Sequence, residues 1–121
     1  MPRIVHFELP VTDAQRAAGF YEDVFGWKVE SWEGGDGYWL VTTGTDEMGI
    51  DGAFISRDLA PQLVNVIGVD SVDSYLERAE RAGAKVVRPK QEIPNVGYAA
   101  YIQDPDGNTV GLFEPMGEMP G

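Results

Sequence analysis

The chain of 121 residues contains no cysteine and only one histidine, His6. Without cysteine there is no disulfide, no thiolate metal site and no cysteine nucleophile. This is compatible with a reducing compartment, and we expect a cytoplasmic protein. The single histidine means that only one side chain changes charge near neutral pH without perturbation.

Basic residues and long hydrophobic runs are also scarce. Lysine and arginine number 9 against 20 acidic residues, which gives a formal net charge of −11. Nucleic acids and anionic membranes require a positive surface, so we expect neither as a partner. The N-terminus lacks the features of a signal peptide, and no apolar run reaches the ~20 residues of a membrane span. The composition therefore predicts a soluble protein whose ligand is neutral or cationic.

Several sequence motifs for common chemistries are missing. There is no phosphate-binding G-x-x-x-x-G-K-[ST], no G-x-G-x-x-G after a predicted strand and no G-x-S-x-G nucleophile elbow. The acidic segment 104–107 lacks the spaced ligands of a calcium loop, so we interpret it as a turn. Nothing here predicts a nucleotide-binding protein or a serine hydrolase.

The hydrophobic pattern predicts the order strand, helix and three strands, occurring twice. In residues 4–11 apolar and other side chains alternate, as in a strand with one buried face. Segments 13–26 and 72–83 have helical spacing; in the first, the predicted apolar stripe comprises Ala17, Phe20, Tyr21, Val24 and Phe25. The remaining predicted strands are 27–32, 38–44, 49–56, 63–69, 84–89, 98–103 and 108–114. Turns are expected at 34–37, 46–48 and 104–107.

Short words recur between the two halves. FGWKV at 25–29 matches AGAKV at 82–86, GYWLV at 37–41 matches GYAAY at 97–101, and GAF at 52–54 matches GLF at 111–113. The offsets are similar, near 58 residues, and the words keep their order. This pattern indicates an internal duplication of one βαβββ unit. We therefore predict a single domain over 1–121, made of modules 4–57 and 63–115.

The duplicated unit resembles the vicinal oxygen chelate superfamily, which contains glyoxalases, bleomycin resistance proteins and extradiol dioxygenases. The resemblance rests on H-x-x-L-x-V-x-D from His6 to Asp13, FGW at 25–27, DPDGN at 104–108 and the repeat itself. It implies an α+β fold in which two βαβββ modules form a U-shaped, partly open, eight-stranded mixed sheet around a cavity, with the helices outside. It also implies a homodimer.

The resemblance further implies a divalent metal held by His, Glu or Gln at four strand positions. His6 occupies the first of these positions, seven residues before Asp13. The others contain Val64, Gly111 and Gly52, none of which has a donor side chain. One histidine cannot hold a metal firmly, so we expect no metal and no other cofactor.

Three residues close to these positions have oxygen atoms that could bind a metal if the strands were arranged differently. A bulge could bring Asn65 into the position of Val64, and Asp51 adjoins Gly52 but is predicted to face the other way. Glu114 lies three residues beyond Gly111, again on the wrong face. The glycines themselves indicate either bulges or space for a close-approaching ligand.

His6 and Glu8 are the candidate catalytic residues. They lie on one face of the first strand, about 6.6–7 Å apart along it, and could serve as an acid–base pair. Alternatively, His6 is a hydrogen-bonded structural residue and Glu8 lies at a solvent-exposed rim.

Trp39, Tyr98 and Tyr101 are the candidate ligand-binding residues, chosen from the strand aromatics because they lie on the third strand of each module. Aromatic walls with acidic groups suit cationic or aromatic organic molecules. Packing in the core or in a dimer interface is the alternative for each of them.

Three functional hypotheses remain at this point. The first is a protein that binds a small, cationic or aromatic organic molecule without a catalytic metal. The second is a glyoxalase-like lyase or isomerase that uses His6 and Glu8, with or without a weakly held divalent metal. The third is an interaction module that needs no cavity.

Overall fold

The computed structural model describes residues 2–32, 36–45 and 48–117. Parts of two predicted turns, Gly34–Gly35 and Asp46–Glu47, lie outside this range. The elements follow the predicted order: β1 (Arg3–Val11), α1 (Ala14–Phe25), β2 (Lys28–Ser31), β3 (Tyr38–Thr42), β4 (Gly52–Ser56), β5 (Val64–Gly68), α2 (Val72–Arg81), β6 (Lys85–Ile93), β7 (Gly97–Gln103) and β8 (Thr109–Pro115).

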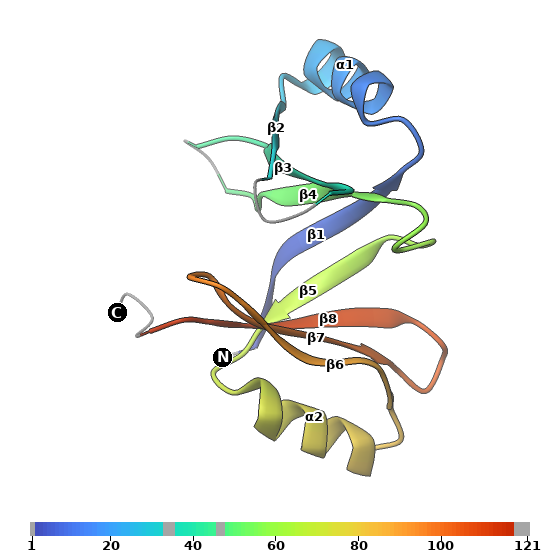
Figure 1. Cartoon of the computed structure of the whole chain (residues 1–121), viewed down its shortest axis with the longest axis vertical. Coiled ribbons are helices and arrows are strands. Elements are labelled where there is room, and N and C mark those ends of the chain that lie inside the picture. The colour runs from blue at the N-terminus through green and yellow to red at the C-terminus, as the bar shows by residue number, and fades with distance from the viewer. Residues whose placement is uncertain (1, 33–35, 46–47, 118–121) are drawn as a thin grey trace. The chain divides into compact units, whose positions relative to one another are not determined.

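The two halves have the same strand topology, which confirms the predicted βαβββ duplication. In the N-terminal module, β1 pairs in parallel with β4, which continues antiparallel through β3 to β2. In the C-terminal module, β5 pairs in parallel with β8, which continues antiparallel through β7 to β6. Each module therefore has four mixed strands, in the order β2-β3-β4-β1 in the first module and β5-β8-β7-β6 in the second (Figure 1).

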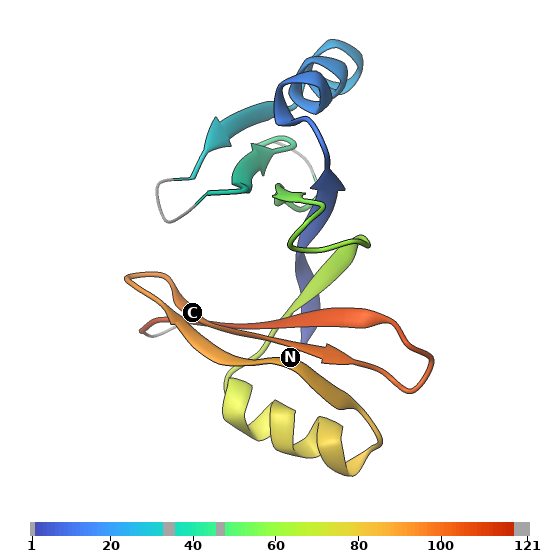
Figure 2. The same cartoon turned by 45° about the vertical axis from the view of Figure 1, so that its right-hand side comes forward.

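Residues His6–Val64 form one compact unit of the structure, and Met1–Val5 with Asn65–Gly121 form the other. Each unit has its own helix lying against one face of its own strands (Figure 2). We call this the helix face, and the opposite side of the same strands the distal face. The distinction decides which side chains can take part in a common site.

The helices begin and end where the sequence predicts. The side chain of Asp13 accepts a hydrogen bond from the backbone nitrogen of Arg16 at the start of α1. Gly26 ends that helix with φ 74°, a left-handed conformation that glycine adopts without steric cost. Ser71 caps α2 in the same way as Asp13 caps α1, by accepting from the backbone nitrogen of Ser74.

Each helix face contains a small hydrophobic core. In the N-terminal module Val11, Val41 and Phe54 are buried beneath α1. In the C-terminal module the buried residues are Val69, Val72, Ala100 and Leu112. The apolar face predicted for residues 4–11 is therefore the helix face of β1.

The apolar stripe predicted for α1 is wrong in part. Phe20, Val24 and Phe25 are 54%, 53% and 59% exposed, although all three belong to the predicted stripe. Ala17 and Tyr21 of the predicted stripe do pack against the core, together with two further alanines of α1, Ala14 and Ala18. Tyr21 also stacks on Trp27, with ring centroids 4.7 Å apart.

One strand is longer than predicted. The segment expected at 84–89 continues as β6 to Ile93, through Pro89. β6 lies at the edge of the sheet, where a proline removes no hydrogen bond that a neighbouring strand needs. Two register shifts against β7 accompany the proline.

Among the helices of the described residues, none is long and apolar enough to cross a membrane.

Candidate functional site

The distal face of the N-terminal module brings together the polar side chains of β1. Phe7, Leu9 and Val11 pack on the helix face, so the alternation of a strand places His6 and Glu8 on the distal face. β3 alternates in the same way: Val41 lies in the core beneath α1, and Tyr38 therefore lies on the distal face.

Tyr38 links the two candidate catalytic residues through its hydroxyl group. The Tyr38 hydroxyl donates a hydrogen bond to Glu8 Oε2 at 2.7 Å. His6 Nε2 lies 2.8 Å from the same hydroxyl oxygen. The rings of His6 and Tyr38 are nearly parallel, and Trp32 meets the Tyr38 ring edge to face at 5.4 Å. Tyr38, which is 32 residues from His6 and 30 from Glu8 in the sequence, thus joins these two side chains in one hydrogen-bonded chain.

Glu8 is deeply buried, with 4% of its surface exposed. A carboxylate removed from water is costly unless hydrogen bonds or charges compensate for it, and Tyr38 supplies one such bond. Glu8 is the one charged residue that is buried among those the structure describes. This buried carboxylate is linked to His6 through the Tyr38 hydroxyl, which makes the group a candidate functional site.

His6 is half-buried and lies in an acidic environment. Burial lowers the pKa of His6 from its ordinary value, and the negative charges of Glu8 and Asp51 partly oppose that shift. Burial therefore favours the neutral imidazole. Asp51 is itself held by Thr43, whose backbone nitrogen and hydroxyl both donate to Asp51 Oδ1, at 2.9 and 3.2 Å.

Asp51 and Gly52 exchange the faces that the sequence predicted for them. In the parallel ladder Glu8 pairs with Ala53, and extending this register by two residues places Asp51 beside His6 on the distal face. Gly52 lies on the helix face. The repeat words aligned Gly52 with Gly111, but the ladders align Ala53 with Gly111, because Glu8–Ala53 and Val66–Gly111 are corresponding pairs. A shift of one residue in a strand reverses the face of its side chain.

The two strand glycines mark close packing of side chains, and neither lies at a bulge. The ladders through β4 and β8 are unbroken at both positions. A Cβ atom on Gly52 would lie 2.5 Å from the ring of Phe7. A Cβ atom on Gly111 would lie 3.0 Å from Val66 and 3.4 Å from the Tyr101 ring. Neither glycine therefore leaves empty space for a ligand.

The C-terminal module offers no donors at the predicted metal positions. Val64 is buried, and the unbroken register of β5 leaves Asn65 on the opposite face, so the bulge that would move Asn65 does not occur. Glu114 has another partner: its Oε1 accepts a hydrogen bond from the backbone nitrogen of Val72, the first residue of α2. There it satisfies a helix N-terminus.

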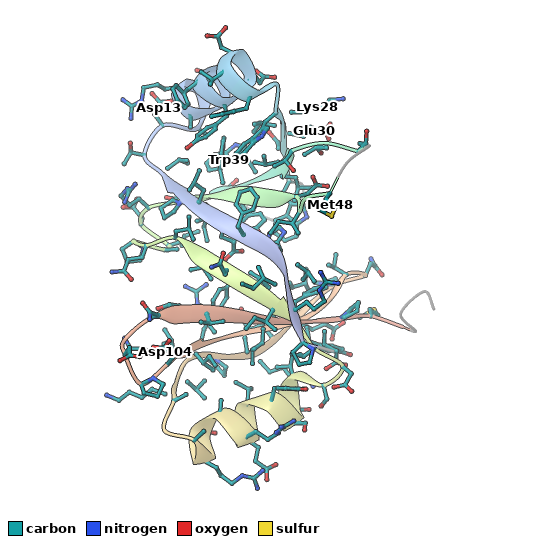
Figure 3. All side chains as sticks on the ribbon, turned by 180° about the vertical axis from the view of Figure 1, so that it is seen from behind. Asp13, Lys28, Glu30, Trp39, Met48 and Asp104 are labelled. Atoms are coloured by element: carbon teal, nitrogen blue, oxygen red, sulfur yellow. The ribbon has the colours of Figure 1, made fainter. Side chains whose placement is uncertain are left out.

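The three aromatic residues predicted to bind ligand lie in different surroundings. Trp39 packs on the helix face with Val41 (Figure 3). Strand alternation places this face opposite to that of Tyr38. Tyr98 packs against the core beneath α2, and Lys90 Nζ lies 4.5 Å from its ring centroid. Tyr101 lies on the distal face of its own module, opposite Gly111, with the Arg88 guanidinium 5.5 Å from its ring centroid.

Tyr38 is the residue that sequence reasoning did not select. It is one of several aromatic residues on predicted strands, and the prediction favours its neighbour Trp39. In segment 38–41 both alternating sets are apolar or aromatic, so periodicity alone does not say which set faces the core. The pairing of β3 with β4 resolves this, because Trp39 lies opposite the buried Phe54.

Comparisons with known proteins agree with this architecture. The model of the glyoxalase/bleomycin resistance protein/dioxygenase superfamily matches residues 3–112. The chain belongs to this superfamily. A protein of Mycobacterium bovis named "Putative glyoxylase CFP32" is 29% identical over 113 residues, covering 88% of this chain but 43% of the relative. The chain thus spans less than half the length of that relative.

Two further comparisons cover nearly the full length of both proteins. The Pseudomonas aeruginosa protein PA2024 is 31% identical over 132 residues, covering 96% of this chain and 92% of the relative. A superfamily member from Vibrio splendidus has a solved structure with a TM-score of 0.68 at 18% identity, covering 94% of this chain and 99% of that one. The structural likeness shows the fold.

The residues of the present chain do not fit the divalent metal that the family resemblance implies. In the described part of the chain, no group of three or more His, Cys, Asp or Glu side chains is arranged to hold a metal ion. Val64 and Gly111 have no donor atoms, and His6 Nε2 is directed at the Tyr38 hydroxyl. The polar groups of the distal face are thus bonded to one another, in an arrangement suited to hydrogen bonding or proton transfer.

Proposed function

We propose that this protein binds a small organic molecule, cationic or aromatic, on the distal face of its N-terminal module, without a catalytic metal. The observation that carries the proposal is the buried carboxylate of Glu8, held by a tyrosine that also contacts the one histidine. A buried charge costs stability, and its presence on an aromatic-containing strand face is best explained by a ligand that uses it.

The chemistry of the face supports this ligand class. Glu8 and Asp51 contribute negative charge, while the rings of Trp32 and Tyr38 offer aromatic surface next to it. Stacking, cation–π contact and a charge-assisted hydrogen bond would together favour a flat molecule with a basic nitrogen.

A ligand screen by thermal shift tests the proposal. The library should contain aromatic amines, each paired with a neutral molecule of the same shape. A ligand at 100 times its Kd stabilises by about 2.7 kcal/mol, which for a chain of this size corresponds to roughly 10 °C in Tm. We expect amines to stabilise the wild type and to lose most of that effect in Glu8→Gln. A library in which no member raises Tm would contradict the proposal, as would equal shifts in both proteins.

Proton transfer is a second candidate function, favoured by the chain from His6 through Tyr38 to Glu8. A base here could remove the proton from a carbon next to a carbonyl group and return a proton to the neighbouring carbon, as in a glyoxalase-like isomerase or lyase. The glyoxylase name of the mycobacterial relative agrees with such chemistry. Proton NMR in D₂O would follow loss of the C–H signal of small 2-oxo and 2-hydroxy carbonyl compounds. If His6→Ala exchanged them as fast as wild type, this candidate would be dropped.

The expected absence of a metal needs its own measurement. Tag-free protein is incubated with nickel, cobalt, manganese or iron(II), desalted and analysed by mass spectrometry. We expect much less than one equivalent of any metal. Retention of about one equivalent would show that His6 is joined by further ligands, and metal-assisted assays would then replace the first proposal.

We also propose a homodimer. The exposed Phe20, Val24 and Phe25 on α1 and the unpaired edges of β2 and β6 are surfaces that a second copy could cover. Light scattering after gel filtration distinguishes a dimer from a monomer directly.

A further inference from the structure

The hydroxyl of Tyr38 has one proton, and two side chains of the described part of the chain lie within hydrogen-bond distance of it. It donates that proton to Glu8 Oε2 at 2.7 Å. The oxygen can then act only as an acceptor toward His6 Nε2, which lies 2.8 Å away. Nε2 must therefore carry a hydrogen. In a neutral imidazole, the other nitrogen, Nδ1, then has the lone pair.

The second ring nitrogen of His6, Nδ1, is accessible to solvent. The hydrogen bond to Tyr38 is made by Nε2, and no described residue bonds to Nδ1. Among the described residues, no side-chain nitrogen or oxygen is buried without a hydrogen-bond partner. Nδ1 therefore reaches solvent, where a ligand can meet it. Burial also lowers the pKa of His6, which favours the neutral ring.

We propose that Tyr38 is a positioning residue, which uses the Glu8 carboxylate to hold His6 in its Nε2–H tautomer and so presents Nδ1 as the accepting atom of the site. The role of Nδ1 as an acceptor for a ligand rests on the proposed function. The hydrogen bonds that fix the tautomer of His6 are those of the ligand-free protein. In consequence His6 and Glu8 do not act as independent acid and base. They share one hydrogen-bonded chain, with a single basic atom directed outward.

A lone pair on Nδ1 of His6 also restricts which ligands can bind. A lone pair on Nδ1 accepts a hydrogen bond from a hydroxyl or N–H group of the ligand and repels an anionic oxygen. In the proton-transfer alternative, Nδ1 is the atom that would take the proton, and Tyr38 would stabilise the resulting imidazolium through the charge of Glu8.

Nitrogen-15 NMR of ligand-free protein at pH 7.5 tests this directly, because His6 is the only histidine. Long-range correlations from the ring protons identify which nitrogen carries hydrogen, and solvent exchange reports how well that hydrogen is held. In the wild type we expect a protonated Nε2 whose hydrogen exchanges slowly enough to be seen. In Tyr38→Phe we expect exchange at least ten-fold faster and ring-nitrogen shifts nearer those of a free imidazole. Tyr75→Phe, which removes a hydroxyl from α2, is the matched control and should leave the spectrum unchanged.

The same NMR measurement on Glu8→Gln is a second test, which does not require the Tyr38→Phe variant to fold. Its amide can donate to the Tyr38 oxygen, which frees the hydroxyl proton to turn toward His6. We expect Nδ1–H to become populated in this variant. Protonated Nδ1 in the wild type would overturn the inference, as would equal hydrogen exchange in wild type and Tyr38→Phe. Because no ligand is present, either result is independent of whether the screen above finds one.

Discussion

The two modules of this protein are one fold used twice, and their distal faces differ in chemistry. In both, a parallel pair of strands lies beside two antiparallel strands, with a helix on one face. In register, Glu8 and Ala53 of the first module correspond to Val66 and Gly111 of the second. His6 similarly corresponds to Val64. The first module thus has a polar chain where the second has buried valines.

This difference shows at which positions the fold requires an apolar side chain and at which it allows other residue types. The helix faces contain apolar cores in both modules, because each must bury a helix. The distal faces have no such common requirement. A histidine and a buried carboxylate on one of them are therefore not demanded by architecture, and this is why we assign function to them.

The largest expected effect comes from transferring the charge to the other module. Val66 is buried at the position equivalent to Glu8, but no tyrosine corresponds to Tyr38: the ladders place Ala99 there. Val66→Glu should destabilise by about 3–5 kcal/mol, the cost of an uncompensated buried charge. Urea unfolding followed by tryptophan fluorescence measures the change.

The reverse exchange is the control. Glu8→Val should change the free energy of unfolding far less, since replacing a compensated buried charge by an apolar side chain is often neutral or stabilising. Equal losses of stability in the two variants would mean that the two distal faces do not differ in how well they compensate a buried charge.

The next effect concerns the two strand glycines. Gly52→Ala places a methyl group 2.5 Å from the Phe7 ring, within the core beneath α1. Overpacking of this kind typically costs 1–3 kcal/mol, and we expect roughly the upper value. Gly111→Ala should cost about 1 kcal/mol, because its nearest neighbour would be the end of Val66 at 3.0 Å.

Chemical denaturation of both alanine variants, together with the double variant Phe7→Leu/Gly52→Ala, checks this order. A smaller side chain at position 7 should recover part of the Gly52→Ala loss. If Gly111→Ala proved the more damaging change, the close packing assigned to Gly52 would be incorrect.

A smaller effect distinguishes the two helix N-termini. α1 begins with the Asp13 cap, whereas α2 has both Ser71 and the Glu114 carboxylate, which accepts from Val72 at 2.9 Å. Glu114→Gln keeps the shape and removes the charge, and should cost about 0.5–1 kcal/mol. Thermal unfolding in low and high salt is the measurement. A loss that does not shrink with salt would argue against a charge–dipole origin.

Much of this fold was accessible from the sequence, because its signals are local. The alternation of 4–11, the helical spacing of 13–26 and the repeated words predicted the elements and the duplication, and the structure confirms both. The exposed aromatics of α1 were not predictable from spacing. A helical stripe shows which residues share a face, but not how much of that face the strands can cover.

The site was less accessible, because it depends on strand register. Aligning GAF with GLF placed Gly52 where the ladder has Ala53, and this one-residue error reversed the predicted face of Asp51. Tyr38 and Glu8 are 30 residues apart, and only the pairing of β3 through β4 to β1 brings them together. The alternation within each strand is a local signal and does not report which strands pair or in which register.

The smallest expected effect is on pH dependence, and it tests the module difference at His6 itself. Burial lowers the pKa of His6 below its ordinary 6.5, so the unfolded chain binds more protons than the folded one as the pH falls through this range. The stability that neutral His6 contributes is present above pH 6.5 and is lost as the pH falls through the folded pKa. Wild type should therefore lose stability more steeply between pH 7.5 and 5.5 than His6→Gln, which keeps a polar group toward Tyr38.

Among the described residues, the groups that face His6 are Glu8, Asp51 and Tyr38, and none of these side-chain types ordinarily titrates in that window. With no second histidine in the chain, the difference between the two slopes belongs to one residue. Parallel slopes would mean that His6 has the same proton affinity folded and unfolded. Its distal face would then be as open to water as that of a surface strand, and the contrast with the buried Val64 of the second module would disappear.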